Sequence, residues 1–151
     1  MSEIRELYQQ LIIDHGRNPR NFRKITHSSC IIKEGYNPLC GDQLTLYLLC
    51  EDNKVVDVSF TGQGCAISMA SASLMSEKVK GLSIDDAMRV FNQFSAMVKA
   101  DNNEENHEAS LGKLSVLQGV REYPSRIKCA TLAWHTLKSS LLGELGGIKT
   151  E

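Results

Sequence analysis

A short turn at residues 37–42, Asn-Pro-Leu-Cys-Gly-Asp, places the strictest condition on how this chain folds. It sets the thiol of Cys40 and the carboxylate of Asp42 on either side of a glycine. Pro38 restricts φ and Gly41 permits backbone angles that other residues avoid, so both side chains can point into one space from a loop. We therefore expect a metal-binding corner here, to which the rest of the chain brings further ligands.

Two more cysteines stand where such ligands are needed. Cys65 lies where a strand pattern gives way to a helix pattern, and Cys129 lies near the start of the last helical segment. Either one alone could be a core residue at a helix start, and Asp42 could instead cap a turn. Taken together, the three thiolates and the carboxylate would complete a tetrahedral zinc site.

The other cysteines and the histidines fit simpler roles. Cys30 and Cys50 lie in strand patterns, where a free cysteine behaves as a small buried hydrophobe, so we leave them out of the site. The four histidines are scattered along the chain, and we expect each to be a surface or packing residue: His15, His27, His107 and His135.

Length, charge and cysteine content narrow the class of protein. A chain of 151 residues fits one domain, covering residues 1–151. Its formal net charge of −1 creates no long-range field that would attract nucleic acid or an anionic membrane. We see no apolar signal core and no apolar run near the roughly 20 residues that span a bilayer, so we expect a cytoplasmic protein. Five cysteines in a reducing compartment favour metal or sulfur chemistry over disulfides.

Hydrophobic periodicity predicts the α+β class, with a small antiparallel three-stranded sheet packed against several helices. Strands are predicted at residues 30–33, 43–50 and 55–60, and the short turns between them are typical of a meander. In such a sheet the loop before the second strand and the end of the third can share an edge. We expect the metal site at that edge and at the helix N-termini.

Helical patterns cover most of the remaining chain. They predict helices at residues 4–12, 66–80, 84–98, 111–120 and 124–141, with Ser83 as the N-cap of the third. Helix N-termini favour a thiolate over a thiol, which suits Cys65 and Cys129. Residues 99–112 are polar and predict an exposed loop. A basic group after the first helix is interpreted as a solvated linker or a docking patch: Arg17, Arg20, Arg23 and Lys24.

Three motifs resemble those of the IscU/NifU-like iron–sulfur assembly family, and the match extends over nearly the whole chain. They are residues 37–42, the Gly62-x-Gly64-Cys65-Ala66-Ile67-Ser68 turn, and residues 126–134 around Cys129. Within the family the chain is similar to the SufU branch on two counts. An inserted segment lies near residues 100–118, and Lys128 stands where scaffold-type members carry a histidine.

This resemblance implies a zinc-dependent sulfurtransferase that accepts persulfide sulfur from a pyridoxal-phosphate-dependent cysteine desulfurase of the SufS type. Cys40 would be the catalytic acceptor, and Cys40, Asp42, Cys65 and Cys129 the zinc ligands. Downstream iron–sulfur scaffold proteins are the implied recipients, with no nucleic acid or membrane partner. Two alternatives stay open: a scaffold that assembles and hands on a [2Fe–2S] cluster or binds iron, and a small domain with purely structural zinc. Arg126 and Lys128 would offset the charge of the site, contact a partner, or be solvated surface charge.

Overall fold

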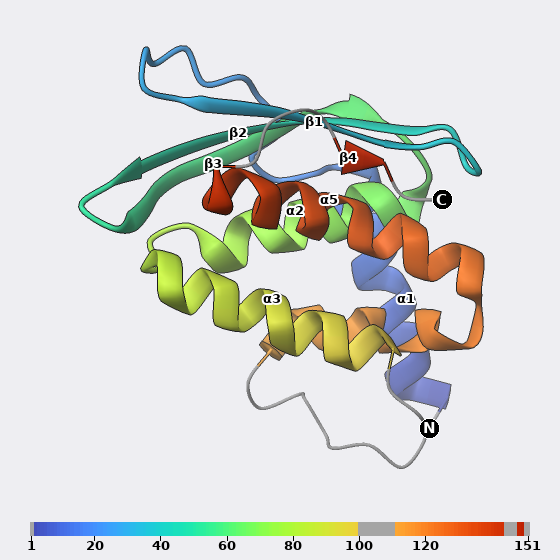
Figure 1. The fold of residues 1–151 in the computed structure, drawn as a ribbon. Helices are drawn as coiled ribbons and strands as arrows, with labels where there is room; N and C mark the ends of the chain where they lie inside the picture. The colour runs from blue at the N-terminus through green and yellow to red at the C-terminus, as the bar shows by residue number, and fades with distance from the viewer. Residues whose placement is uncertain (1, 100–110, 144–147, 150–151) are drawn as a thin grey trace.

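The computed structural model describes residues 2–99, 111–143 and 148–149, and it has the predicted α+β class, with helices against one face of an antiparallel sheet (Figure 1). In chain order the elements are α1 (Ser2–Arg17), β1 (Ile31–Asn37), β2 (Asp42–Glu51), β3 (Lys54–Gln63), α2 (Ala66–Val79), α3 (Ile84–Lys99), the 3-10 helix η1 (Gly112–Glu122), α5 (Pro124–Leu142) and β4 (Ile148–Lys149). The three predicted strands are all present as an antiparallel meander.

The sheet has the strand order β3-β2-β1-β4 within the described residues, and the short β4 runs parallel to β1. Strand β1 continues to Asn37 and β3 to Gln63, well past their predicted ends. The expectation that Asp42 lies in a loop was wrong, because Asp42 begins β2 and pairs with Asn37. Pairing with a neighbouring strand outweighs the low strand propensity of Gly and Asn at these ends.

The helices form two layers below the sheet (Figure 1). Helices α2 and α5 lie directly beneath it, and α1, α3 and η1 cover their other side. Leu46 of β2, Phe60 of β3 and Trp134 of α5 are fully buried and belong to one hydrophobic core cluster. The Trp134 ring stacks on Phe94 of α3 with ring centroids 4.4 Å apart, which joins the two helical layers.

The boundaries of α3 and α5 follow the expected local signals, whereas α1 runs past its predicted residues 4–12 at both ends. Ser83 caps α3 through a hydrogen bond from the Asp86 N–H to its Oγ, at 3.0 Å. Pro124 occupies the first turn of α5, and Gly143 ends that helix with a φ of 69°. The segment predicted as a helix at residues 111–120 forms the 3-10 helix η1. Residues 100–110 of the predicted loop lie outside the described residues.

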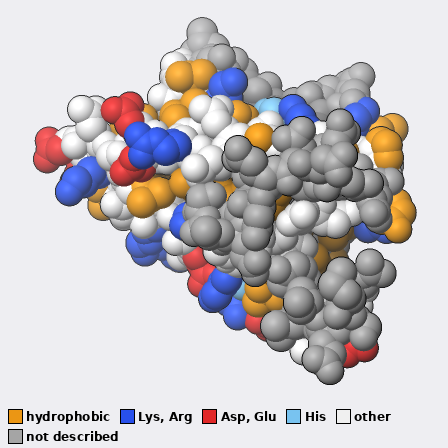
Figure 2. All heavy atoms as spheres, turned by 90° about the horizontal axis from the view of Figure 1, so that it is seen from below, with side chains coloured by type: hydrophobic (Ala, Val, Ile, Leu, Met, Phe, Trp, Pro, Cys, Tyr) orange, Lys and Arg blue, Asp and Glu red, His pale blue; other side chains and the backbone are white. Residues whose placement is uncertain are grey.

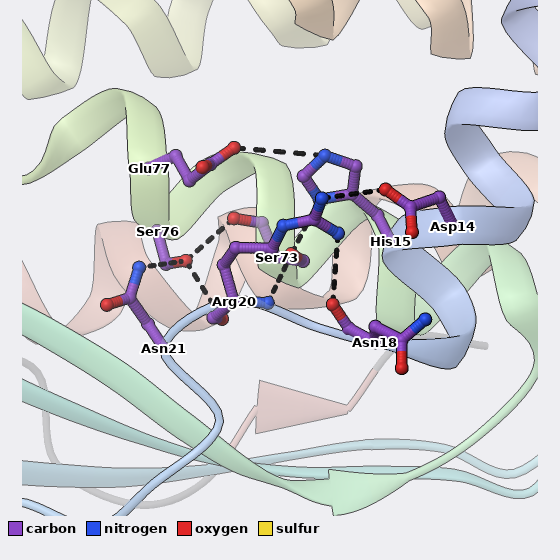
Figure 3. A network of polar contacts seen from close by, with 8 residues as sticks. All are labelled: Asp14, His15, Asn18, Arg20, Asn21, Ser73, Ser76 and Glu77. Carbon is purple, nitrogen blue, oxygen red and sulfur yellow. Dashed lines mark hydrogen bonds and ion pairs between the residues drawn. The ribbon is translucent and has the colours of Figure 1, made fainter.

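A polar network joins the end of α1 and the segment after it to α2 (Figure 3). The Ser73 Oγ of α2 accepts a hydrogen bond from the Arg20 backbone N–H at 2.8 Å and lies 2.7 Å from Nδ1 of the fully buried His15. Because that oxygen accepts from Arg20, its own proton is free to be donated to His15. Asn21 Nδ2 also donates to Ser76 Oγ at 3.0 Å. The network therefore holds α2, the helix that starts beside Cys65.

Two of the four basic residues in this region form ion pairs. Arg20 lies 2.7 Å from Asp14, and Arg23 holds both carboxylate oxygens of Asp57 at 2.7 and 3.1 Å. On the described part of the helical side, acidic and basic side chains lie next to one another (Figure 2). Among the described residues, no helix has the length and hydrophobicity needed to cross a membrane.

Candidate metal centre

The turn between β1 and β2 presents one exposed and one buried candidate ligand. Cys40 is exposed in this turn, and Gly41 after it adopts a φ of 70°, which only glycine takes without strain. Asp42 follows as the first residue of β2 and is 0 % exposed. The turn thus places a thiol at the surface directly above a buried carboxylate.

Helix α5 brings a second thiol to this turn. Cys129 is 0 % exposed, and its Sγ lies 3.1 Å from the Cys40 Sγ. One ligand atom each from Cys40, Asp42 and Cys129 lies within 4.8 Å of the other two. Residues far apart in the sequence are therefore gathered where the sheet edge meets the first turns of α5.

Cys65 joins the same corner through its backbone. It is the N-cap of α2, and its N–H donates to Asp42 Oδ1 at 2.9 Å. Its half-buried thiol accepts a hydrogen bond from the Ser68 N–H at 3.5 Å, and is not among the ligand atoms that lie within 4.8 Å of one another. The structure thus brings three of the four predicted ligands together, while the thiol of the fourth, Cys65, caps the adjacent helix.

Two residues that the sequence analysis did not single out position the Asp42 carboxylate. Asn37 Nδ2 donates to Asp42 Oδ2 at 3.0 Å. A Cβ added at Gly64 would lie 2.6 Å from Asp42 Oδ1, so only glycine leaves room for the carboxylate. Asn37 could have been found from the turn itself, because residues that face each other across a hairpin share one side of the sheet. Gly64 carries no comparable local signal.

Burial dominates the acid–base behaviour of the Cys129 thiol. It raises the pKa of the Cys129 thiol far above its ordinary value, and the contacts with Cys40 and Asp42 raise that pKa further. Without a bound cation Cys129 therefore keeps its proton at neutral pH. A metal ion that binds here must displace this proton, so metal affinity rises with pH.

The remaining cysteines and histidines lie outside this centre. Cys30 and Cys50 are half-buried rather than fully buried, and burial raises the pKa of both thiols. His15 is buried and hydrogen-bonded to Ser73, and the His135 ring packs against the Phe91 ring. His27 is exposed, and His107 lies outside the described residues.

The donor set fits a zinc ion. Zinc prefers four tetrahedral ligands, with bonds of about 2.3 Å to sulfur and about 2.0–2.2 Å to carboxylate oxygen, so its ligands lie a few ångströms apart. The three grouped atoms meet this condition. A carboxylate buried as completely as Asp42 also needs donors or a cation to replace its lost hydration.

Comparison with known proteins identifies the family. The model of the NifU-like N-terminal domain matches residues 7–130, which include the turn, the α2 start and Cys129. The chain belongs to this IscU/NifU family, as its motifs predicted.

Individual relatives of the chain carry two kinds of name. The zinc-dependent sulfurtransferase SufU of Bacillus subtilis is 42 % identical to it, over 93 % of both chains. An iron–sulfur cluster assembly scaffold protein IscU of Thermotoga maritima is 38 % identical, over 89 % of this chain and 92 % of the relative. A crystal structure described as a putative iron–sulfur cluster assembly scaffold protein for the SUF system, from Fervidobacterium islandicum, superposes with a TM-score of 0.80. It is 35 % identical and covers 90 % of this chain and 97 % of its own.

Proposed function

We propose that this protein is a zinc-dependent sulfurtransferase for iron–sulfur cluster assembly. Cys40 accepts sulfur from a persulfide on a pyridoxal-phosphate-dependent cysteine desulfurase of the SufS type, and iron–sulfur scaffold proteins receive it. Cys40, Asp42, Cys65 and Cys129 are the zinc ligands. The observation that carries the proposal is an exposed thiol 3.1 Å from a buried one and beside a buried carboxylate.

The exposure of Cys40 favours transfer over a purely structural metal. A structural zinc site is closed on all sides, whereas a reactive site keeps an accessible position. Cys40 lies on the surface in a turn, and Leu39 beside it is 64 % exposed. A partner can therefore reach the thiol without any movement of the sheet or helices.

The transfer step is a thiol exchange that balances without an added oxidant or reductant. The Cys40 thiolate attacks the outer sulfur of the desulfurase persulfide, and a new S–S bond forms as the old S–S bond breaks. The desulfurase cysteine leaves as a thiolate, and Cys40 becomes the persulfide. The proton of Cys40 must be removed before this attack, since the thiol is a poor nucleophile. A bound zinc ion supplies that condition by holding its sulfur ligands as thiolates.

Cys65 has a defined part in this proposal. Its thiol caps α2 through the Ser68 N–H, so a metal bond to the same sulfur would join the metal to the start of α2. Its backbone N–H meanwhile keeps hold of Asp42. Metal binding and the start of α2 are thereby coupled.

The decisive experiment measures the turnover of a cysteine desulfurase with zinc-loaded protein in the absence of iron, against a zinc-stripped sample. We expect a large acceleration that disappears on stripping. The relatives named as scaffolds support a second function, assembly of a [2Fe–2S] cluster. No acceleration, together with a coloured cluster once ferrous iron is supplied, would establish that function instead.

Replacing the acceptor tests the assignment of roles. We expect Cys40→Ser to lower desulfurase stimulation by at least about 100-fold, because a hydroxyl does not supply a nucleophile comparable to a thiolate. Cys50→Ser is the matched control, since Cys50 lies outside the centre and should keep full stimulation. Mass spectrometry of the trapped persulfide should find the added sulfur on Cys40, and sulfur still accepted by Cys40→Ser would show that another thiol is the acceptor.

A further inference from the structure

Asn37 connects the two buried candidate ligands of the metal centre. It is the last residue of β1, faces Asp42 across the hairpin, and is 0 % exposed. Its Nδ2 donates to Asp42 Oδ2 at 3.0 Å and to Cys129 Sγ at 3.5 Å. One amide group thus spans from the start of β2 to α5.

The orientation of this amide follows from its surroundings. The opposite orientation would place the amide oxygen against a carboxylate oxygen, where two acceptors repel each other. As it stands, Asn37 Oδ1 is buried with no hydrogen-bond partner among the described residues. A buried amide oxygen without a hydrogen-bond partner lowers the stability of the folded state. The two hydrogen bonds that the Asn37 Nδ2 donates must therefore offset this cost.

Hydrogen-bond donors are distributed unequally over the three thiols. Cys129 Sγ accepts from the Asn37 side chain, and Cys65 Sγ accepts from the Ser68 backbone N–H. Among the described residues, the Cys129 thiol is the hydrogen-bond donor to Cys40 Sγ. When Cys129 is a thiolate it has no proton to donate, and Cys40 loses this hydrogen bond. A hydrogen bond to a thiolate withdraws electron density from sulfur and makes it a weaker nucleophile.

We infer that Asn37 is a positioning residue that keeps Asp42 and Cys129 as retained ligands and leaves Cys40 as the thiolate that reacts. This inference rests on the proposed function and deepens it, because it says how the centre distinguishes two thiols only 3.1 Å apart. Asn37 acts through its neighbours and does not touch the transferred sulfur.

Cobalt(II) substitution tests this inference without any measurement of sulfur transfer. Charge transfer from a thiolate to cobalt needs more energy when the sulfur accepts a hydrogen bond. We therefore expect Asn37→Leu, which has the same branched shape and no donors, to shift the charge-transfer bands to lower energy. We also expect about 10- to 100-fold weaker metal binding in competition with a chelator, the usual cost of losing a group that supports a ligand.

Two further variants make the result decisive. Thr136→Val on α5 also replaces a fully buried polar side chain by an apolar one of the same shape, and Thr136 bonds within its own helix to the Leu132 carbonyl. It should leave the bands in place. Asn37→Ala removes the amide donors without adding bulk. The same measurements are made on this variant if Asn37→Leu does not fold.

The outcomes separate this inference from the proposed function. Shifted bands in the Asn37 variants, with unshifted bands in Thr136→Val, support it. Thiolate bands in the unaltered protein that do not move in the Asn37 variants overturn the role of Asn37 and leave the zinc site standing. If the unaltered protein shows no thiolate bands with cobalt, the metal site and this inference both fail.

Discussion

Asp42 shows how one side chain in this protein depends on its immediate neighbours. It is fully buried, and each of its oxygens accepts a hydrogen bond, from the Cys65 backbone on one side and the Asn37 side chain on the other. Gly64 supplies the space in which the carboxylate lies. The position of this candidate ligand is thus set by the Asn37 side chain, the Cys65 backbone and the space at Gly64.

Adding one methyl group at Gly64 should therefore damage the centre. In Gly64→Ala the new Cβ would lie 2.6 Å from Asp42 Oδ1 and 3.2 Å from its Cβ and Cγ. We expect a loss of about 1–3 kcal/mol in unfolding free energy from overpacking. We also expect zinc affinity to fall by about tenfold or more as Asp42 is displaced, measured by competition with a chelating dye.

Gly119→Ala is the matched control for this substitution. A Cβ at Gly119 would meet nothing within 4 Å, and neither glycine has a left-handed backbone. The control should keep full zinc affinity. Equal affinity in Gly64→Ala would mean that Asp42 can move aside and still bind, or is not a ligand.

At the scale of elements, α2 is held at both its start and its middle. Cys65 caps its first turn, and the polar network around Ser73 and Ser76 ties it to the end of α1 (Figure 3). The fully buried His15 is the part of this network that responds to pH. Burial lowers the pKa of His15, with Arg20 nearby acting in the same direction and Glu77 opposing them.

This lowered pKa makes stability fall in acid. Below the ordinary histidine pKa of about 6.5, the unfolded chain binds a proton that folded His15 resists, so unfolding becomes more favourable as pH falls. For each such histidine we expect a slope of up to about 1.4 kcal/mol per pH unit below pH 6.5. Urea unfolding at several pH values between 7.5 and 5.5 measures it.

His15→Gln should reduce this slope even if it lowers stability at every pH. It should not abolish the slope, because burial lowers the pKa of His135 as well. The exposed His27 offers the control His27→Gln, which should keep the slope of the unaltered protein. An unchanged slope in His15→Gln would show that His15 is not the group that titrates.

At the scale of the whole molecule, the centre links parts of the chain that are distant in sequence. Its candidate ligands come from the β1–β2 turn, the first residue of β2, the N-cap of α2 and the first turns of α5. A metal ion bound to all four would hold the sheet edge and two helices together. Ligand binding of this kind stabilises the folded state through mass action.

Metal removal should therefore lower global stability. With free zinc at 100 times its dissociation constant, binding contributes about 2.7 kcal/mol to the folded state, which a strong chelator removes. Thermal unfolding with and without chelator should show this as a lower midpoint. In the control variant Cys50→Ala, the chelator should lower the unfolding midpoint by as much as it does in the unaltered protein. A midpoint that does not respond to chelator would indicate that the isolated chain does not hold zinc.

Local sequence signals were enough to identify most elements. The alternating pattern of β2, the Ser83 cap and the helix that starts at Pro124 all depend on signals that act over a few residues, and each was confirmed. The ends of β1 and β3 were not predictable from these signals. They depend on hydrogen bonding to β2, which overrides the preferences of glycine and asparagine.

The sequence by itself determined the α+β class and the family and supplied the candidate metal ligands, because these follow from periodicity, turn chemistry and side-chain type. Only the tertiary structure decided that Asp42 begins a strand, that Asn37 donates to both Asp42 and Cys129, and that Gly64 makes room for the carboxylate. The tertiary structure also places the Cys65 thiol at the N-cap of α2, where it accepts a hydrogen bond from the Ser68 N–H. These contacts depend on distances between segments far apart in the chain, which arise only when the sheet and helices pack together.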